Sequence, residues 1–457
     1  MDQLERRQYW SQAAVGLASF LTPFLNGALA VAMPSIGREF SLYPHQLPLV
    51  VLAHLVPAAA FMAIFGRLSD HLGNKRIFLC GSVLFICASV TATLAPNLPA
   101  LLAARAMQGL ADSMTFGVGA AILMDSAASE RRGRALGLNL MFVYVGLALG
   151  PLVGGILTAS VSWRAIFVLC ALIGAGACTL IARNRPPDAP GHMAGFDWTG
   201  AVTYVPAMLA LVGGLATQPS LWGLGVMAAG ALLGARFVRM QARLKSPLIA
   251  PQLFTDNHRF SHAAFAGAFG YTAAFSTSLL LSITLQGVLG LSPGAAGVFL
   301  LVQPATQALL SPLAGTLSDR IAPTRLSALG LGVLGLGLWA LAAWSEGLTT
   351  AGVAGFQIVL GAGFAFFASP NIHALMGSVD TTRRGVASGL LATMRTSGMS
   401  LSMALTGVML ALFSGDGAAG RVGAEALPAV RAAFALFGCF AMLAAWISFR
   451  GGRDKIA

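Results

Sequence analysis

Apolar residues fill most of the chain in long uninterrupted runs, and short polar segments separate these runs. A helix needs about 20 apolar residues to cross the hydrocarbon core of a bilayer. Fourteen runs reach that length, so we expect an all-α integral membrane protein with fourteen transmembrane helices. The runs cover residues 12–33, 47–65, 77–95, 98–124, 135–158, 163–182, 198–216, 221–238, 260–285, 293–316, 325–344, 350–376, 385–413 and 430–449.

Composition and charge support the membrane assignment. Of the 457 residues, 56% are hydrophobic and only 10% are charged, against roughly 25% charged residues in a soluble domain. The net charge of +12 does not indicate a nucleic-acid partner, because the basic residues gather in short clusters between the apolar runs. Lys and Arg concentrate in cytoplasmic loops of membrane proteins. The clusters therefore predict a multi-pass protein of the bacterial inner membrane, with both termini in the cytoplasm.

Two short sequences recur at nearly the same offset. Gly66-Arg67-Leu68-Ser69-Asp70 returns 249 residues later as Gly315-Thr316-Leu317-Ser318-Asp319, and Arg131-Arg132-Gly133 returns 252 residues later as Arg383-Arg384-Gly385. The matched positions lie eight runs apart rather than six, which indicates two related six-helix halves and an inserted pair. Repeated halves around a midplane site are a common transporter plan. We predict an N-terminal bundle, a linker with inserted helices 7 and 8, and a C-terminal bundle, at residues 1–185, 186–250 and 251–457.

A basic cluster with one acid follows the second run, in the expected loop between helices 2 and 3. A glycine lets two helix ends approach closely, and a carboxylate beside cations can latch one mouth of a two-state bundle. The alternative is that the cluster only reflects the positive-inside topology. The predicted cytoplasmic latch consists of Gly66, Arg67, Asp70, Gly73, Lys75, Arg76 and the repeat acid Asp319.

The fourth run contains Arg105-Ala106-Met107-Gln108-Gly109, followed by Asp112. Residues seven apart lie on one face of a helix, two turns from each other, so Arg105 and Asp112 share a face with Gln108 between them. A charge at mid-membrane depth is costly and should face the bundle interior with a partner. From its depth and facing we predict that Asp112 takes part in proton coupling, with Arg105 and Gln108 beside it on the same face. The alternative is a static buried ion pair that holds helix 4 to its neighbour.

The fifth run carries Gly146-x-x-x-Gly150-Pro151-x-x-Gly154-Gly155. Glycines spaced four apart form a stripe without side chains, on which another helix can pack closely. Pro151 removes one backbone hydrogen bond and bends the helix. The repeat equivalent keeps Gly398 but has Ser402 and Met403 where Gly150 and Pro151 stand. This asymmetry favours a functional role over a general packing seam, which is the alternative.

Together, the three motifs resemble the major facilitator superfamily, specifically its fourteen-helix drug:proton antiporter family, over essentially the whole chain. The resemblance implies two pseudo-symmetric six-helix bundles plus an inserted helix pair, proton coupling through Arg105, and export with the helix 5 glycine motif sealing the pathway. The chain departs from the family pattern at three positions. Asn26 stands where helix 1 usually has an acid, and His71 and Asn74 stand where the latch motif usually has basic residues.

Four polar residues within the runs are candidates for the substrate cavity: Asn26, Tyr271, Gln303 and Arg395. The amide of Asn26 releases no proton, so Asp112 is the single acid deep in any run. The missing acid favours neutral or anionic amphiphiles over cationic drugs as substrates. Arg395 can meet an anionic substrate, or it can cap carbonyls and pair with another helix. His54 is a candidate for proton relay, with a structural histidine as the alternative.

We therefore predict a proton-coupled exporter of small hydrophobic or amphipathic compounds that works by alternating access. The alternative is an exchanger or carrier for a specific metabolite, lipid or metallophore on the same fold. The sequence contains no nucleophile–base or metal-ligand cluster and no Walker A motif, so we expect no enzyme, cofactor or metal site. The expected partners are a small-molecule substrate, protons and the lipid bilayer, and a monomer suffices for this architecture.

Overall fold

The computed structural model describes residues 3–126, 132–183, 196–244, 248–249, 251–344, 349–379, 384–413 and 423–452. Within these ranges every regular element is helical. The elements are α1 (Gln3–Glu39), η1 (Pro44–Gln46), α2 (Leu47–Leu72), α3 (Asn74–Thr93), α4 (Leu98–Ser126), α5 (Arg132–Ser160), α6 (Arg164–Arg183), α7 (Trp198–Ala216), α8 (Leu221–Gln241), α9 (Gln252–Thr255), α10 (His258–Ala274), α11 (Thr277–Ile283), η3 (Thr284–Val288), α12 (Pro293–Leu300), α13 (Val302–Ser318), α14 (Pro323–Ala343), α15 (Thr350–Gly377), α16 (Arg384–Phe413), η5 (Ala424–Ala426) and α17 (Leu427–Gly451).

Thirteen helical segments in the described part of the chain are long and apolar enough to cross a membrane. They coincide with thirteen of the fourteen predicted runs. The remaining run corresponds to α4, which has 29 residues and carries Arg105, Asp112 and Asp125. The described helices confirm the predicted all-α membrane fold, with thirteen segments of spanning length and apolarity and α4 as a further long helix.

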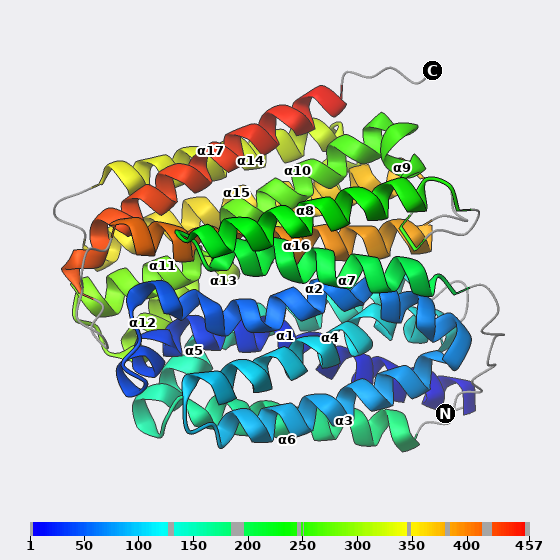
Figure 1. Ribbon diagram of the computed structural model, residues 1–457, viewed down its shortest axis with the longest axis horizontal. Coiled ribbons are helices and arrows are strands. Elements are labelled where there is room, and N and C mark those ends of the chain that lie inside the picture. Colours follow the sequence, from blue (N-terminus) through cyan, green and yellow to red (C-terminus); the bar gives the residue numbers. More distant parts are fainter. Residues whose placement is uncertain are drawn as a thin grey trace.

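The helices pack into two halves with the same internal arrangement. In the first half, α1 packs against α5 and α6, and α4 packs against α2 and α3. In the second half, α10 packs in the same way against α16 and α17, and α15 packs against α13 and α14. We call α1–α6 the first half and α10–α17 the second half; they lie on opposite sides of the molecule in Figure 1. This correspondence is what the sequence repeat predicts.

The pair α7–α8 lies between the two halves, as the green helices in the middle of Figure 1 show. Helix α7 contacts α2 of the first half and α16 of the second. The pair is closed on itself at one end, because Asp197 accepts a hydrogen bond from Gly200 N at the start of α7 and another from Gln241 Nε2 of α8, at 2.5 Å. Of the predicted linker before this pair, residues 186–195 lie outside the described part of the chain.

Two predicted helices are interrupted in the structure. Helix 9 comprises α10, α11 and the π-helical turn η3, and helix 10 comprises α12 and α13. Between α10 and α11, the backbone N–H of Ser276 donates to Ser402 Oγ of α16, so a side chain replaces the helical acceptor. Near the start of α13, Pro304 has no N–H to donate to the carbonyl of Leu300, the last residue of α12. Both interruptions lie beside the space between the two halves.

The predicted loop between helices 2 and 3 is much shorter than expected. Helix α2 continues to Leu72 and α3 begins at Asn74, so Gly73 alone forms the connection. Its φ of 94° is a conformation that glycine adopts without the strain caused by a side chain. The latch motif therefore lies mainly within the last turns of α2 and the first turn of α3.

Helix α1 begins and α17 ends at the same end of the molecule (Figure 1), which we call the terminal end; the other is the distal end. The two halves touch at the distal end, where Gln286 Nε2 donates to the carbonyl of Val31 at 2.8 Å. At the terminal end, a methyl group added at Gly66, Gly137 or Gly389 would meet no described neighbouring atom within 4 Å. The halves are thus in contact at the distal end, and these three glycines have open space beside them.

Candidate functional site

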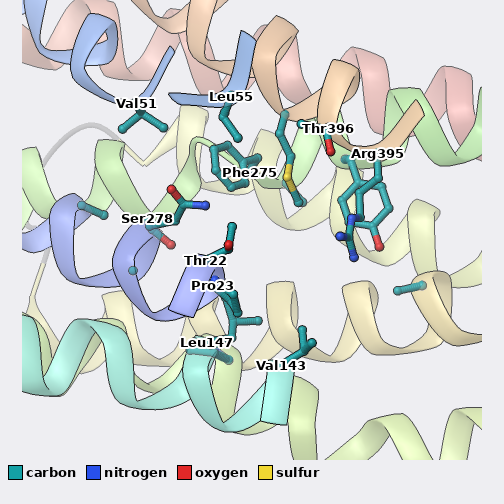
Figure 2. A pocket seen from close by; sticks show the side chains of 18 of the residues that line it. Thr22, Pro23, Val51, Leu55, Val143, Leu147, Phe275, Ser278, Arg395 and Thr396 are labelled. Atoms are coloured by element: carbon teal, nitrogen blue, oxygen red, sulfur yellow. The ribbon is translucent and has the colours of Figure 1, made fainter. Parts of the chain in front are cut away.

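A cavity of about 200 Å³ lies between the two halves. Helices α1, α2, α4 and α5 line it from the first half, and α10, α11, α13, α15 and α16 line it from the second. Figure 2 shows Thr22, Leu55, Leu147, Phe275 and Arg395 around this space. The wall is mainly apolar with a few polar groups, which is the usual character of a small-molecule site.

Asp112 contributes the carboxylate of the cavity, from the middle of α4. Its side chain is almost fully buried, and side chains from two neighbouring helices of the first half lie beside its oxygens. The hydroxyl of Thr22 on α1 donates to Oδ1, and His54 Nε2 on α2 lies 3.7 Å from Oδ2. A mid-membrane acid that faces a cavity is the arrangement expected of a functional group.

Arg105 shares a helix face with Asp112 but forms no direct ion pair with it, so the alternative of a static pair is not what the described residues show. The Arg105 side chain is fully buried, donates from Nε to the carbonyl of Val50 at 3.1 Å, and donates from Nη1 to Gln108 Oε1 at 2.7 Å. Gln108 in turn donates to Ser89 Oγ at 2.8 Å. Seven helical residues rise about 10 Å, so a shared face does not bring the two charges into contact. Arg105 ties α4 to α2 and α3 instead.

All four predicted cavity residues line the cavity: Asn26, Tyr271, Gln303 and Arg395. Arg395 reaches across from α16 to the first half, where its guanidinium lies 4.9 Å from the ring centroid of Phe116. Its charge also acts on the side chain of Tyr271. Two of the group's buried polar atoms, Asn26 Oδ1 and Arg395 Nε, have no hydrogen-bond partner among the described residues.

The glycine motif of α5 faces two different helices. A methyl group at Gly150 would lie 2.5 Å from the carbonyl oxygen of Phe24 on α1, and one at Gly146 or Gly154 would also collide with α1. A methyl group at Gly155 would instead lie 2.5 Å from the carbonyl oxygen of Pro293, at the start of α12 in the second half. The stripe therefore packs α5 onto α1 and continues into the distal contact between the halves.

Pro151 also belongs to this distal contact. Its side chain lies against Gly27 of α1, where an added methyl group would approach it to 2.8 Å. Its carbonyl oxygen faces Gly297 of α12, where a methyl group would collide. Two helices from opposite halves thus cross at backbone distance beside the cavity, which only residues without bulky side chains permit.

The predicted latch residues lie at the terminal end. Asp319 is exposed and its Oδ1 lies 3.9 Å from His373 Nδ1 on α15, within the second half. In the first half, Asn74 Nδ2 donates to Asp125 Oδ2 at 3.1 Å, which joins the start of α3 to the end of α4. The side chain of Asp70 lies outside the described residues, as do Arg131 and Arg383. The latch stays a prediction.

Thr22 is a site residue that sequence reasoning missed, and His54 was considered only as an isolated relay candidate. Neither forms a motif with Asp112, because the three side chains come from three different helices. A usable signal existed for Thr22: it lies 249 residues before Tyr271, the offset of the sequence repeat. Each of the two equivalent residues interacts with one charged side chain of the cavity. Thr22 donates a hydrogen bond to Asp112, and Tyr271 interacts with Arg395.

Comparison with known proteins gives a consistent class of relatives. The chain is 31% identical over 415 residues to the uncharacterized transporter YebQ of Escherichia coli, with 90% of this chain and 91% of the relative covered. It is 30% identical over 417 residues to the multidrug resistance protein Stp of Mycobacterium tuberculosis, covering 89% and 77%. It is 25% identical over 390 residues to the riboflavin transporter RibZ of Clostridioides difficile, covering 84% of each.

Solved structures share the fold at lower sequence identity. A crystal structure of the peptide transporter POT in complex with alafosfalin matches with a TM-score of 0.74 at 15% identity, covering 99% of each chain. The Major Facilitator Superfamily model matches residues 15–242 and 263–455. The fold, the cavity between two repeated halves and these matches lead to one conclusion: the chain belongs to the Major Facilitator Superfamily and is a multi-pass membrane transporter, not an enzyme.

Proposed function

We propose that the protein is a proton-coupled exporter of small hydrophobic or amphipathic compounds, of the fourteen-helix drug:proton antiporter type. The observation that carries this proposal is the position of Asp112. It is the acid that lines the central cavity, it lies midway along α4, and it contacts His54 and Thr22 on two other helices. Relatives with multidrug resistance names, such as Stp, add support.

In the proposed mechanism, protonation of Asp112 changes the balance between two packings of the halves. The neutral acid and the carboxylate differ in how well Thr22 and His54 satisfy them, so each protonation state favours a different arrangement of α1, α2 and α4. Gly155 and Pro151 let α5 and α12 separate and close again at the distal end without side chains in the way. Alternating access follows from this two-state motion.

We further propose the topology and organisation that the sequence predicts. Both termini lie in the cytoplasm of a bacterial inner membrane, so the distal end faces outward and the latch residues lie at the cytoplasmic mouth. Residues 1–185 and 251–457 act as two bundles, and 186–250 carry the inserted pair. The contact of α7 with both α2 and α16 supports this division. The proposed protein works as a monomer.

The test uses the purified full-length chain in proteoliposomes under an imposed pH gradient. The probes are naphthalenesulfonate, naphthalenesulfonamide and naphthyltrimethylammonium, which share one ring system and differ in charge. One proton moving down about 100 mV supplies about 2.3 kcal/mol, enough for about a 40-fold concentration ratio. Wild type should accumulate at least one probe, and Asp112→Asn should not.

A matched control removes an acid outside the cavity. Asp256 follows the short helix α9 and accepts a hydrogen bond from Thr255, so Asp256→Asn should accumulate the probe like wild type. Gradient-driven accumulation in Asp112→Asn equal to wild type would exclude Asp112 from the mechanism. Absence of gradient-driven accumulation of all three probes by wild type would contradict the proposal for compounds of this kind.

A second candidate function is a carrier for one defined metabolite on the same fold. The neutral Asn26 in the cavity wall favours it, because the resembled drug exporters usually have an acid there. The relative named as a riboflavin transporter also supports it. A strain that lacks the protein distinguishes the two: loss of a multidrug exporter changes sensitivity to several unrelated toxic compounds, whereas loss of a specific carrier does not.

A further inference from the structure

The cavity wall contains one acidic and one basic side chain, from opposite halves. Asp112 lines it from α4 and Arg395 from α16. The other polar wall groups are neutral, and most of the surface is apolar. The charge preference of such a cavity depends on which of the two charged groups still offers hydrogen-bonding capacity to a ligand.

The acid is largely enclosed by side chains of its own half, although only one of its oxygens accepts a hydrogen bond among the described residues. Its Oδ1 accepts from the Thr22 hydroxyl and its Oδ2 lies beside His54 Nε2. The side chain is about 7% exposed. Both neighbours come from the first half, and the small exposed fraction leaves a cationic group of a ligand little access to the carboxylate. The amide at Asn26 supplies no second negative charge.

Arg395 is in the opposite situation. Its Nε is buried and has no hydrogen-bond partner among the described residues. The guanidinium lies over the face of Phe116 and interacts with Tyr271, and no carboxylate of the described residues lies within ion-pair distance of it, although Asp112 attracts it at longer range. An unpaired buried donor carries a free-energy cost that an incoming acceptor removes. A guanidinium fork also matches the two oxygens of a carboxylate, sulfonate or phosphate ester.

The surroundings of Arg395 suit the apolar part of a ligand. Met399 and Met403 follow it on the same helix and line the cavity, and Phe275, between α10 and α11, and Leu55 of α2 line it too. Figure 2 shows Leu55 and Phe275 beside the space into which Arg395 points. Methionine side chains adapt to varied apolar shapes. The wall therefore combines one cationic anchor with a deformable hydrophobic surface.

We propose that Arg395 is the substrate anchor and that the transported class is the hydrophobic organic monoanion, with its charged group on Arg395 and its apolar body against the Met399–Phe275 wall. This inference rests on the proposed function, whose substrate class it names. Tyr271 is a positioning residue that holds the guanidinium toward the cavity. The acid of the first half then handles the proton, and the base of the second half handles the substrate.

The charge of the proposed substrate determines how much net charge crosses the membrane in each transport cycle. When a monoanion leaves the cell and one proton enters, both movements carry positive charge inward, so two charges cross per cycle. Exchange of a monocation for one proton carries no net charge. Flux of an anionic substrate should therefore increase with an inside-negative potential as well as with the pH gradient.

The experiment measures equilibrium binding of the three naphthalene probes to the purified full-length protein in lipid nanodiscs. Wild type should bind naphthalenesulfonate about ten times more tightly than naphthalenesulfonamide or naphthyltrimethylammonium, because a charge-assisted hydrogen bond replaces an unpaired donor. Arg395→Gln should abolish this preference, and Arg395→Lys should retain part of it. Arg239→Gln, on α8 and outside the cavity, should bind like wild type.

Binding and flux separate the two hypotheses. No preference for the sulfonate in wild type, or an equal preference in folded Arg395→Gln, overturns the assignment of Arg395 whatever the flux shows. Thermal unfolding of each variant checks that it is folded. If Arg395→Gln does not fold, Arg395→Lys takes its place: a sulfonate preference equal to that of wild type in Arg395→Lys then overturns the assignment. A sulfonate preference without any gradient-driven flux supports the anchor and contradicts the proton-coupled function instead.

Discussion

The two halves of the molecule share one packing plan but carry different chemistry. Helix α4 of the first half has Arg105, Gln108 and Asp112, whereas the positions 249 residues later on α15 are Ala354, Gln357 and Gly361. Conversely, α16 of the second half has Arg395, and the position 252 residues earlier on α5 is the apolar Val143. The repeat therefore supplies the packing scaffold of both halves. The charged residues within the helices are not repeated: Arg105 and Asp112 occur only in the first half, and Arg395 occurs only in the second.

The packing contacts, in contrast, are nearly the same in both halves. Gly146 of α5 faces the carbonyl of Phe20 on α1, and its repeat equivalent Gly398 of α16 faces the carbonyl of Ala268 on α10. The two carbonyls are 248 residues apart, close to the repeat offset. Close helix contact is therefore a property of the fold, and the additional glycines of α5 are a property of the first half.

The largest expected effect comes from removing the two cavity charges one at a time. Asp112→Asn should lower pH-gradient-driven accumulation of naphthalenesulfonate about 40-fold, for a gradient of about 100 mV, and leave its binding largely intact. Arg395→Gln should lower binding about tenfold. Flux and binding assays on both variants check this separation. If each variant loses both properties to the same extent, the division of roles between the halves is wrong.

The next effect concerns the shared scaffold. Gly146→Leu and Gly398→Leu should each destabilise the protein by about 1–3 kcal/mol or more, because a side chain collides with a backbone carbonyl that cannot move aside. Thermal unfolding in detergent measures the loss. Gly137→Ala is the matched control, since no described atom lies within 4 Å of the added methyl group. A loss in only one half would show that the two contacts are not equivalent.

A smaller effect is expected at the distal contact. A methyl group at Gly155 would lie 2.5 Å from the Pro293 carbonyl oxygen, whereas one at the repeat position Gly407 would have 3.5 Å to its nearest neighbour. Gly155→Ala should therefore favour separation of the halves distally by about tenfold, and Gly407→Ala should change little. The measurement is the reaction of Ser278→Cys with an impermeant thiol reagent outside intact cells.

Two comparisons make the reading of that experiment unambiguous. The protein without Ser278→Cys gives the background reaction of the native cysteines. Equal labelling rates for Gly155→Ala and Gly407→Ala would contradict a sealing role of the glycine motif at this contact.

The smallest predicted effect is a change of charge preference in the cavity. Asn26→Asp adds a carboxylate to the wall that also contains Arg395. An added negative charge opposes an anion and attracts a cation, so binding of naphthalenesulfonate should weaken and that of naphthyltrimethylammonium should strengthen, each by about threefold at a partly solvated site. Competition binding in nanodiscs measures both. Unchanged binding of both ions would place Asn26 outside the ligand's reach.

Much of the fold follows from the sequence, because lipid enforces a simple pattern. Every spanning segment must be apolar and helical, so run length alone locates the helices, and the repeat at Asp70 and Asp319 indicates the two halves. The interruptions in helices 9 and 10 do not follow from run length. They depend on Ser402, a residue of a distant helix, and on Pro304 at a position where the chain can also bend without breaking.

The site is predictable only in part. Membrane depth indicates that Asp112 needs partners, but helix periodicity compares residues only within one helix. It therefore points to Arg105 on the same face, while the actual partners, Thr22 and His54, come from α1 and α2. Contacts between helices depend on rotation and crossing angle, which a single sequence does not specify.

The central claim is that Asp112 exchanges protons with a cavity that also binds substrate. The most direct measurement traps a pH-sensitive dye in proteoliposomes and follows proton movement when a naphthalenesulfonate gradient is imposed without a pH gradient. Wild-type protein should move protons against the substrate flow, and Asp112→Asn should still exchange substrate but move no protons. Equal substrate-driven proton movement by Asp112→Asn and wild type would contradict the account.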